Sequence, residues 1–330
     1  MAAGIQTTLG KAFEYACIKA LYEKYEGTQD IEIEDSPQLR TARAKFESSQ
    51  DKQQDMSDAA AAAVRVIDRL EPRLRYPEND IPLILSIQPD AAGIAGDVRD
   101  VLCIRRGNKW EIGLSCKHNH HAVKHSRLSD MIDFGQEWFG YPCSAQYFRE
   151  VVPRFTRLRQ MRDDARDNGE TALWEDVDRK FEDYYIPILQ AFMDELNRLA
   201  QEHADVPAKL IRYLLGRYDF YKVITDDARR ATRVEAFNLA GTLNARSEGN
   251  RSITPIQLLQ MPTRFYHIGF KETNSGLSQT TITVVCDKGW EISMRLHNAS
   301  SRVEPSLKFD VNLISVPTSI HVQVEPWDYE

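Results

Sequence analysis

The sequence lacks the features that mark secreted, membrane-spanning and zinc-ribbon proteins. Its five cysteines include no Cys-x-x-Cys pair, so we expect neither a disulfide framework nor a zinc ribbon, and a cytoplasmic location is expected. No apolar run approaches the ~20 residues of a membrane span. The first residues also lack the basic stretch and apolar core of a signal peptide. We therefore expect no membrane partner.

A large excess of positive charge is also missing. The formal net charge of the 330 residues is -7, which does not favour nucleic-acid binding by the surface as a whole. If the chain binds nucleic acid, the positive charge must be local. Hydrophobic residues make up 42% of the chain, enough for a sizeable core in one large domain or two ordinary ones.

Hydrophobic periodicity predicts a mixed α/β (α+β) fold. Helical spacing covers residues 8–25, 38–53 and 57–70, the last with Ser57 as its N-cap. Strands are predicted at 83–87, 98–104 and 110–117, and the last two form a hairpin around a turn at 106–108. Residues 150–222 are predicted to be helical, with Pro187 in the first turn of a helix. A second hairpin, 281–286 with 290–297, and strands at 311–314 and 320–324 follow.

The first hairpin has the order acid, strand, lysine that metal-dependent phosphodiesterases use. Asp100 begins the apolar run 101–104, and Lys117 ends the next strand. Asp97 is the second candidate for the strand acid. Asp90, in a Pro-Asp dipeptide followed by a loop, is the third. Such a site needs a cation that neutralises phosphate charge and activates water, and a lysine that acts on that water.

The expected acid-x-Lys slot reads Ser115–Cys116–Lys117, so a carboxylate is missing there. Alternation places Glu111 on the same face as Ser115 and Lys117. However, Glu111 lies about 20 Å from Lys117 at roughly 3.3 Å per residue. Magnesium binds one or two protein carboxylates, so the second must come from elsewhere. Glu14 on the first helix is our first choice, and Asp130 and Asp133 are alternatives.

A basic run follows the lysine. No acidic residue occurs from 112 to 129, and four of the eight histidines fall within it. Such clustering suits contacts with phosphates. The candidate DNA-binding residues here are Lys124, His125, Arg127, His118 and Asn119. A solvated basic face is the alternative, and a zinc site including Cys116 is a further one, although its spacing matches no standard site.

A polar strand face in the C-terminal region is the second candidate DNA contact. Arg295 and His297 share a face opposite apolar residues, and Asn298 and Arg302 follow. Arginine pairs with guanine and asparagine with adenine in the major groove. An ordinary half-exposed strand explains the alternation equally well.

With these residues in view, the chain resembles the HaeIII-type restriction endonucleases of the PD-(D/E)xK nuclease class. The resemblance rests on Gly96-Asp97-Val98-Arg99-Asp100-Val101, on Lys117-His118-Asn119-His120 and on Arg295-Leu296-His297-Asn298. It extends over residues 10–16, 110–115, 122–129 and 303–310. It implies a restriction-endonuclease-like core sheet flanked by helices at 1–150, a helical insertion at 151–250 and a β-rich DNA-recognition region at 251–330.

The resemblance also implies a type II restriction enzyme that uses Mg²⁺ to cut double-stranded DNA at a short palindrome, with GGCC as the family's type site. A palindrome implies a homodimer, and a cognate DNA methyltransferase protects the host DNA. Asp100 would bind Mg²⁺ with Glu14 or Asp97 assisting, and Lys117 would act on the attacking water. Ser115 departs from the family's pattern. The alternatives are a sequence-specific DNA-binding protein without catalysis and a structure-specific repair or recombination nuclease.

Overall fold

The chain folds into two compact units, each assembled from separated stretches of sequence. The computed structural model describes residues 2–77, 81–89, 96–118, 122–247 and 249–328; the side chains of residues 2–7, 118 and 122–125 fall outside this description. The first unit consists of Met1–His121, Arg217–Leu259 and Thr318–Glu330, and the second of Ala122–Gly216 and Gln260–Pro317.

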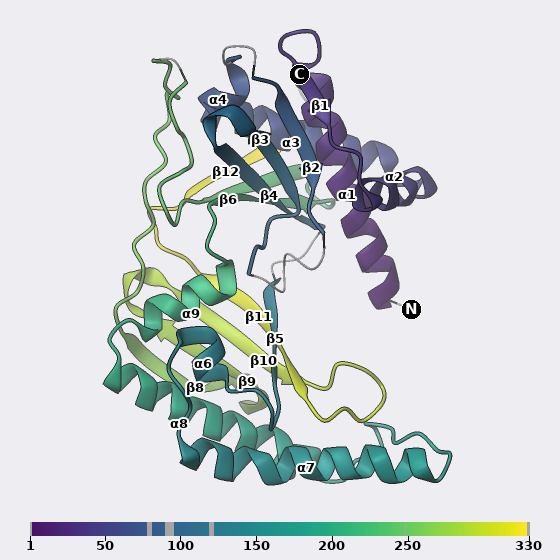
Figure 1. Cartoon of the computed structure of the whole chain (residues 1–330), viewed down its shortest axis with the longest axis vertical. Helices are drawn as coiled ribbons and strands as arrows, with labels where there is room; N and C mark the ends of the chain where they lie inside the picture. The colour runs from purple at the N-terminus through teal and green to yellow at the C-terminus, as the bar shows by residue number, and fades with distance from the viewer. Residues whose placement is uncertain (1, 78–80, 90–95, 119–121, 248, 329–330) are drawn as a thin grey trace. The chain divides into compact units, whose positions relative to one another are not determined.

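A mixed sheet forms the centre of the first unit (Figure 1). Among the described residues it has seven strands, in the order β1-β2-β3-β4-β6-β7-β12. The strands are β1 (Ile31–Ile33), β2 (Leu83–Ile87), β3 (Val101–Arg105), β4 (Trp110–His118), β6 (Phe220–Asp226), β7 (Ala231–Phe237) and β12 (His321–Pro326). The β1–β2 and β4–β6 pairs are parallel and the other pairs are antiparallel. The 3-10 turn η1 (Arg106–Asn108) joins β3 to β4.

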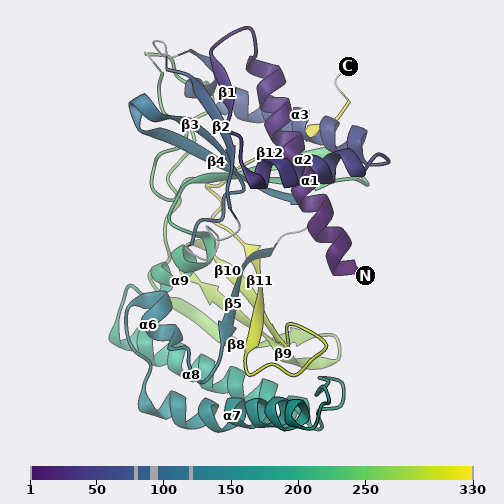
Figure 2. The same ribbon diagram turned by 45° about the vertical axis from the view of Figure 1, so that its right-hand side comes forward.

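Two long helices cover one face of this sheet (Figure 2). Helix α1 (Ala2–Tyr25) packs on β2, β3 and β4, and α3 (Gln53–Leu70) packs on β6, β7 and β12. Helix α2 (Pro37–Ser48) lies against α1, and the short α4 (Pro72–Arg75) follows α3. The Ser36 hydroxyl accepts a hydrogen bond from the Leu39 amide, and Pro37 occupies the first turn, so α2 begins at a strong N-cap.

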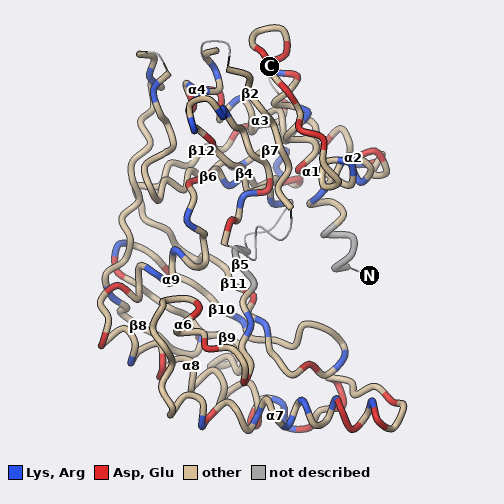
Figure 3. Tube along the Cα trace, in the orientation of Figure 1, with Lys and Arg blue, Asp and Glu red and all other residues tan. Residues whose placement is uncertain are grey.

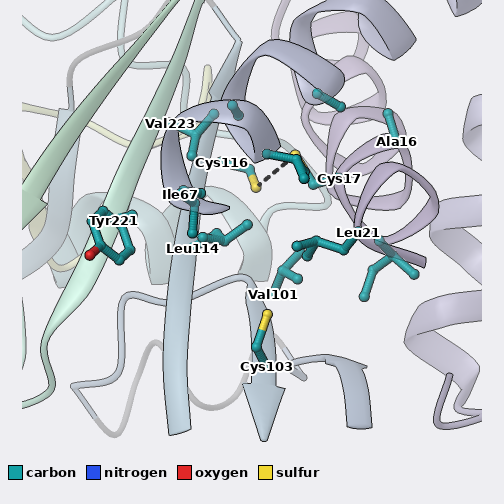
Figure 4. Close-up of a cluster of buried hydrophobic side chains, with 14 of the residues drawn as sticks. Ala16, Cys17, Leu21, Ile67, Val101, Cys103, Leu114, Cys116, Tyr221 and Val223 are labelled. Atoms are coloured by element: carbon teal, nitrogen blue, oxygen red, sulfur yellow. Dashed lines mark hydrogen bonds between the residues drawn. The ribbon is translucent and has the colours of Figure 1, made fainter. Parts of the chain in front are cut away.

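Strand alternation gives the sheet one apolar face and one that carries polar groups. Leu114, Cys116 and Val223 point into the core beneath α1 and α3, where Cys116 contacts Cys17 of α1 at 3.7 Å between sulfur atoms (Figure 4). The intervening residues Ser115 and Lys117 therefore lie on the other face.

The second unit is an antiparallel sheet with helices packed on it. Among the described residues its strands are ordered β5-β11-β10-β9-β8. They are β5 (Ala122–Leu128), β8 (Phe265–Thr273), β9 (Gly276–Cys286), β10 (Glu291–His297) and β11 (Leu307–Ser315), with the turn η3 (Asp287–Gly289) between β9 and β10. The helical segments are α6 (Phe134–Phe139), α7 (Ala145–Asp167), η2 (Phe181–Tyr185), α8 (Ile186–Glu202) and α9 (Val206–Leu215).

The helices of the second unit differ in how they are buried. The apolar side of α8, including Phe192 and Leu196, is fully buried and packs toward β8 and β9. Helix α7 packs on α8, and Figure 3 shows basic and acidic residues interspersed along it. Among the described helices of the chain, none combines the length and the apolar composition that a bilayer span requires.

The predicted mixed α/β fold is confirmed, with several shifted element boundaries. Both predicted hairpins form, and Pro187 lies in the first turn of α8 as expected. The predicted strand at 98–104 begins only at Val101. Ser57 was expected to be an N-cap, which is wrong: α3 begins at Gln53, and the Ser57 hydroxyl donates to the Gln53 carbonyl within the helix.

The compact units cross the boundaries of the three predicted segments. Strands β6 and β7 lie within 151–250, the predicted helical insertion, yet they pair beside β4 in the first sheet. Strand β12 returns from the C-terminal segment to the same sheet, whereas β5 belongs to the second. Residues 151–250 are therefore not helical throughout. The functional roles assigned to the three segments stay predictions.

The loop before β3 is held by the buried guanidinium of Arg99. This group makes ion pairs with Asp97 at 2.7 Å and with Glu111 at 2.9 Å, and it stacks on the Tyr218 ring at 4.0 Å. Its aliphatic stem lies against the backbone of Gly113 in β4. A Cβ at Gly113 would come within 2.1 Å of the Arg99 Cδ and 2.7 Å of its Cβ. Glycine is therefore required at 113 by close approach.

A carboxyl group is fully buried at the end of α3. Glu71 Oε1 accepts hydrogen bonds from the Tyr221 hydroxyl and the Asn244 amide, each at 2.6 Å. Its Oε2 atom has no hydrogen-bond partner among the described residues. Burial is the main cause that raises the pKa of Glu71 to about 7. The protein therefore favours the protonated form of this side chain.

We predict that Gly113→Ala lowers the free energy of unfolding by about 1–3 kcal/mol, because the new methyl group displaces the stem of Arg99. Gly10→Ala in α1 is the matched control. Its Cβ would meet nothing within 4 Å, so better helix propensity should raise stability by about 0.5–1 kcal/mol. Urea unfolding of both variants measures the two changes. Equal stability of Gly113→Ala and the unmodified protein would contradict the packing argument.

We also predict that Glu71→Gln changes how stability depends on pH. The folded-state pKa of about 7 lies above the ordinary value of 4.5. The contribution of Glu71 to the free energy of unfolding is therefore complete below pH 4.5 and is lost as pH rises through 7. Glutamine does not titrate, so the variant does not lose stability in this way. Relative to the unmodified protein it should gain roughly 3 kcal/mol between pH 4.5 and 8, at ~1.4 kcal/mol per pKa unit. Parallel stability curves over this range would disprove the assignment.

Candidate active site

Asp100 and Lys117 meet at the junction of β3 and β4. The Lys117 Nζ lies 3.2 Å from Asp100 Oδ2, and the Cys116 amide donates to the same oxygen at 2.7 Å. The backbone of Asp100 is held in the sheet, since its amide donates to the Leu114 carbonyl and its carbonyl accepts from the Gln88 amide. The carboxylate is thus fixed by three strands, and both side chains remain partly exposed.

Electrostatics favours the charged form of Lys117. Burial alone would lower the pKa of its ammonium group, but the negative charge and hydrogen bond of Asp100 outweigh burial, and the net result is a raised pKa. Glu14 also acts in this direction. Lys117 is therefore a cation and a hydrogen-bond donor at neutral pH.

Glu14 on α1 is the third member of the cluster. Its side chain is almost completely buried, with a residue exposure of 5%, and Lys11 donates to its Oε2 at 3.1 Å. Burial, followed by the charge of Asp100, raises the pKa of Glu14 to about 8, while Lys11 and Lys117 oppose the rise. The structure thus brings together Glu14, Asp100 and Lys117, three residues predicted from sequence.

The other predicted acids lie in different surroundings. Both carboxylate oxygens of Asp97 are bound by Arg99, and this ion pair outweighs burial and holds the pKa of Asp97 below its usual range. Glu111 is the second partner of Arg99, as expected for a residue outside the site. Asp90 lies outside the described residues.

Asp130 and Asp133, the alternative carboxylates, have structural partners in the second unit. Asp130 forms an ion pair with Arg159 at 2.6 Å. Asp133 is the N-cap of α6 and also accepts from the Cys143 amide. These contacts explain both residues without a role in a metal site.

Ser115 is buried beside this cluster and supplies no carboxylate. Cys116 points away into the core toward Cys17. Among the described residues, no group of three or more His, Cys, Asp and Glu side chains is arranged to hold a metal ion by itself. The zinc alternative therefore gains no support from the described part of the chain.

The basic run is described only in part. Asn119 lies outside the described residues, and so do the side chains of His118, Lys124 and His125, although the backbone of the last two belongs to β5. Arg127 is half-exposed, and its guanidinium bonds Glu304 Oε2 at 2.8 Å and the Ser306 hydroxyl at 2.9 Å. A phosphate would have to share this guanidinium with Glu304.

The sheet of the second unit has a polar face opposite its helices. Register places Arg127, Lys308 and His297 in one row and Asp310, Arg295 and Thr281 in the next. A third row contains Asn312, Ser293 and Thr283. We call these nine residues the polar sheet face. Six of them were not proposed as DNA contacts from sequence: Ser293 of β10 itself, and Lys308, Asn312, Asp310, Thr281 and Thr283, which strand register brings beside β10.

The predicted base-reading residues differ in accessibility. Arg295 is exposed, whereas His297 lies 3.1 Å from Asp310. Asn298 is only 9% exposed, and its amide nitrogen donates to the carbonyls of Ser300 and Arg302. Asn298 thus holds the turn, and base contact would require these bonds to break. Arg302 is exposed in that turn.

Sequence reasoning missed Lys11, which bonds Glu14, and a further lysine that strand register places beside Ser115. Lys222 of β6 pairs with Ser115 of β4, and Glu235 of β7 pairs with Lys222 on its other side. A lysine within the apolar run Phe220–Ile224 is the signal that could have revealed it.

Comparison with known proteins identifies the family of the chain. The model of the HaeIII restriction endonuclease family matches residues 10–317. The Type II restriction enzyme HaeIII of Haemophilus aegyptius is 38% identical over 321 residues, which cover 97% of this chain and 97% of that enzyme. No solved structure matches the chain with significance. The chain belongs to the HaeIII restriction endonuclease family.

Proposed function

We propose that this protein is a Mg²⁺-dependent type II restriction endonuclease that cuts double-stranded DNA at a short palindrome. The observation that carries the proposal is the convergence of Glu14, Asp100 and Lys117 at the end of β4. Two carboxylates and a lysine are the groups that metal-assisted phosphodiester hydrolysis requires. The family membership of the chain supports the same activity.

The cluster suits a divalent cation. Burial first, and the charge of Asp100 second, raise the pKa of Glu14, so a bound cation would favour the ionised form of this side chain. Magnesium prefers one or two carboxylates together with water and phosphate oxygens. We therefore infer that Asp100 and Glu14 would hold Mg²⁺. When bound, the cation would supply neutralisation of phosphate charge and a lower pKa for the attacking water.

The residues of the chain act around this centre. The Cys116 amide and Lys117 both donate to Asp100 Oδ2, which fixes the direction of the carboxylate. Because Lys117 is protonated at neutral pH, it stabilises negative charge and orients water instead of removing a proton. Proton removal from the water must then involve another group or bulk solvent.

The polar sheet face is the proposed surface for base recognition. It presents Arg295, Arg127 and Lys308 together with shorter hydroxyl and amide side chains on neighbouring strands. Guanidinium groups bind guanine edges and phosphates, whereas hydroxyls and amides accept several partners. Lys124 and His125, whose backbone belongs to β5, remain proposed contacts with phosphate.

The recognition site and the oligomeric state are two further parts of the proposal. We propose GGCC as the recognition site, the type site of the family that the chain resembles. A twofold DNA site is matched by a twofold protein, so we propose a homodimer. A cognate methyltransferase would protect host DNA without binding this protein.

Lys117→Ala should abolish cleavage of plasmid DNA and leave specific DNA binding largely intact, because the ammonium group acts on reacting atoms. Lys45→Ala, at an exposed position of α2, is the control and should cut normally.

The digest is performed with Mg²⁺ and with EDTA, and the fragment ends are sequenced. Discrete fragments that require Mg²⁺ and end within GGCC are expected. Full activity of Lys117→Ala would disprove the mechanism, and failure of the unmodified protein to cut would leave a DNA-binding protein without catalysis.

Arg295→Ala should weaken binding to the cleavage site by about 10- to 100-fold, because one bidentate base contact contributes ~1–3 kcal/mol. Binding to unrelated duplex should change little. Arg166→Ala, an exposed arginine near the end of α7, is the matched control. Gel-shift titrations in Ca²⁺ compare the two duplexes. An equal loss on both duplexes would assign Arg295 to phosphate contact and overturn its role in base reading.

A further inference from the structure

Arg127, on the polar sheet face, has a guanidinium group that two neighbours hold in one orientation. Its Nη1 atom donates to Glu304 Oε2 at 2.8 Å and to the Ser306 hydroxyl at 2.9 Å. The side chain of Arg127 is 44% exposed and that of Glu304 is 29% exposed, so the pair is accessible from solvent. Both bonds leave from Nη1. They therefore do not use the Nε–Nη2 edge, the pair of parallel donors with which arginine binds two acceptors at once.

The loop between β10 and β11 fixes the backbone next to Glu304. The Val303 amide donates to the Ala172 carbonyl at 2.9 Å, and the Trp174 amide donates to the Ser301 carbonyl at 2.8 Å. These bonds tie the loop to a segment of the same compact unit. The carboxylate thus orients its guanidinium partner before any ligand arrives, and such preorganisation lowers the cost of binding.

The charge of Glu304 decides which ligand suits this guanidinium. Burial is the largest influence on the pKa of Glu304 and would raise it. Hydrogen bonds from Arg127 and Ser300, with the charges of Arg127 and Lys308, outweigh burial and hold the pKa below its usual range. A phosphate that approached Arg127 would therefore meet an ionised carboxylate, and like charges repel. The edge of a base carries no net charge, so it does not suffer this repulsion.

We propose that Arg127 reads a guanine base instead of holding a phosphate, with its Nε–Nη2 edge on the O6 and N7 atoms and with Glu304 as its positioning residue. These two acceptors are the pair that arginine binds in the major groove. The inference rests on the proposed function and deepens it. Strand register places Arg127 one row from Arg295, so the polar sheet face presents two guanine-reading arginines.

The first test separates a base contact from a phosphate contact by its salt dependence. The double variant Arg127→Met/Glu304→Gln removes both charges and keeps the net charge of the chain. At fixed Ca²⁺, its binding to the cleavage site should fall about 10- to 100-fold, the effect of one bidentate base contact. The slope of log affinity against log salt concentration should stay unchanged, whereas loss of one phosphate contact would reduce it by about 0.9.

The matched control removes another exposed ion pair. Arg43 of α2 donates to Glu47 at 2.8 Å, the same distance as in the pair on the polar sheet face. The double variant Arg43→Met/Glu47→Gln should therefore keep the affinity and the salt dependence of the unmodified protein. Circular dichroism spectra of both double variants check that they fold.

The second test examines the positioning role of Glu304. Glu304→Gln leaves Arg127 a cation without its carboxylate partner. Binding to unrelated duplex should strengthen, and its salt dependence should steepen by about 0.9, because the guanidinium now accepts phosphate. Preference for the cleavage site should fall about 10-fold, as for one charged hydrogen bond. Glu47→Gln should change neither quantity, and an equal effect of Glu304→Gln on both duplexes would contradict the positioning role.

The third test locates the contact on the base. Each guanine of the cleavage site is replaced in turn by 7-deazaguanine, in which a C–H group stands in place of N7. At one guanine this change should weaken binding by the unmodified protein about 10-fold. The same replacement should have little effect on Arg127→Met.

The outcomes separate this assignment from the proposed function. If the unmodified protein cuts its site and the Arg127→Met/Glu304→Gln variant binds that site normally, Arg127 reads no base. A salt slope reduced by about 0.9 in that variant would assign Arg127 to phosphate. Equal effects of 7-deazaguanine on Arg127→Met and the unmodified protein at every guanine would also overturn the assignment. If the unmodified protein neither cuts nor binds a specific site, the proposed function fails and the assignment fails with it.

Discussion

The site depends on one oxygen atom of Asp100, Oδ2, which accepts hydrogen bonds from both the Cys116 amide and the Lys117 ammonium group. The hydrogen bond from the Cys116 amide is possible because β3 and β4 are neighbouring strands. Lys117 reaches the same oxygen because it follows Cys116 and points to the opposite face of the strand. Cys116 in turn is fixed by the core, where its sulfur touches Cys17 of α1. Packing of the apolar face thus sets the positions of the reactive groups on the other.

Helix α1 contributes the buried carboxyl group of Glu14 to the proposed site. A carboxyl group with raised pKa beside another carboxylate is unfavourable for folding alone, because both desolvation and repulsion act against its charge. Such groups persist where function requires them. Glu71 is a second buried carboxyl group with a raised pKa, but its partners are a tyrosine hydroxyl and a backbone amide inside the same unit. Of these two buried carboxyl groups, Glu14 lies in the proposed site and Glu71 has no assigned function.

The second unit shows how weakly a local pattern specifies a binding surface. Alternation correctly placed Arg295 and His297 on one polar face of β10. It could not reveal Lys308 or Asn312, because these belong to β11 and become neighbours only through antiparallel register. Asn298 looked like a base-reading residue in sequence, yet its amide closes the turn that follows β10. A polar residue at a strand end serves either purpose, and the position of nearby carbonyls decides which.

The sequence by itself determined the mixed fold, both hairpins and the pairing of Asp100 with Lys117, because strand alternation and helical spacing are local properties of the chain. The role of Glu14 stays a prediction. The tertiary structure decided the rest. It bound Asp97 to Arg99, placed β6 and β7 in the sheet where an insertion was expected, and set Lys222 beside Ser115. Lys222 follows Ser115 by more than a hundred residues, and the parallel β4–β6 pairing that joins them has no turn sequence to announce it. Non-local strand register, which local periodicity does not encode, therefore decided which residues became neighbours.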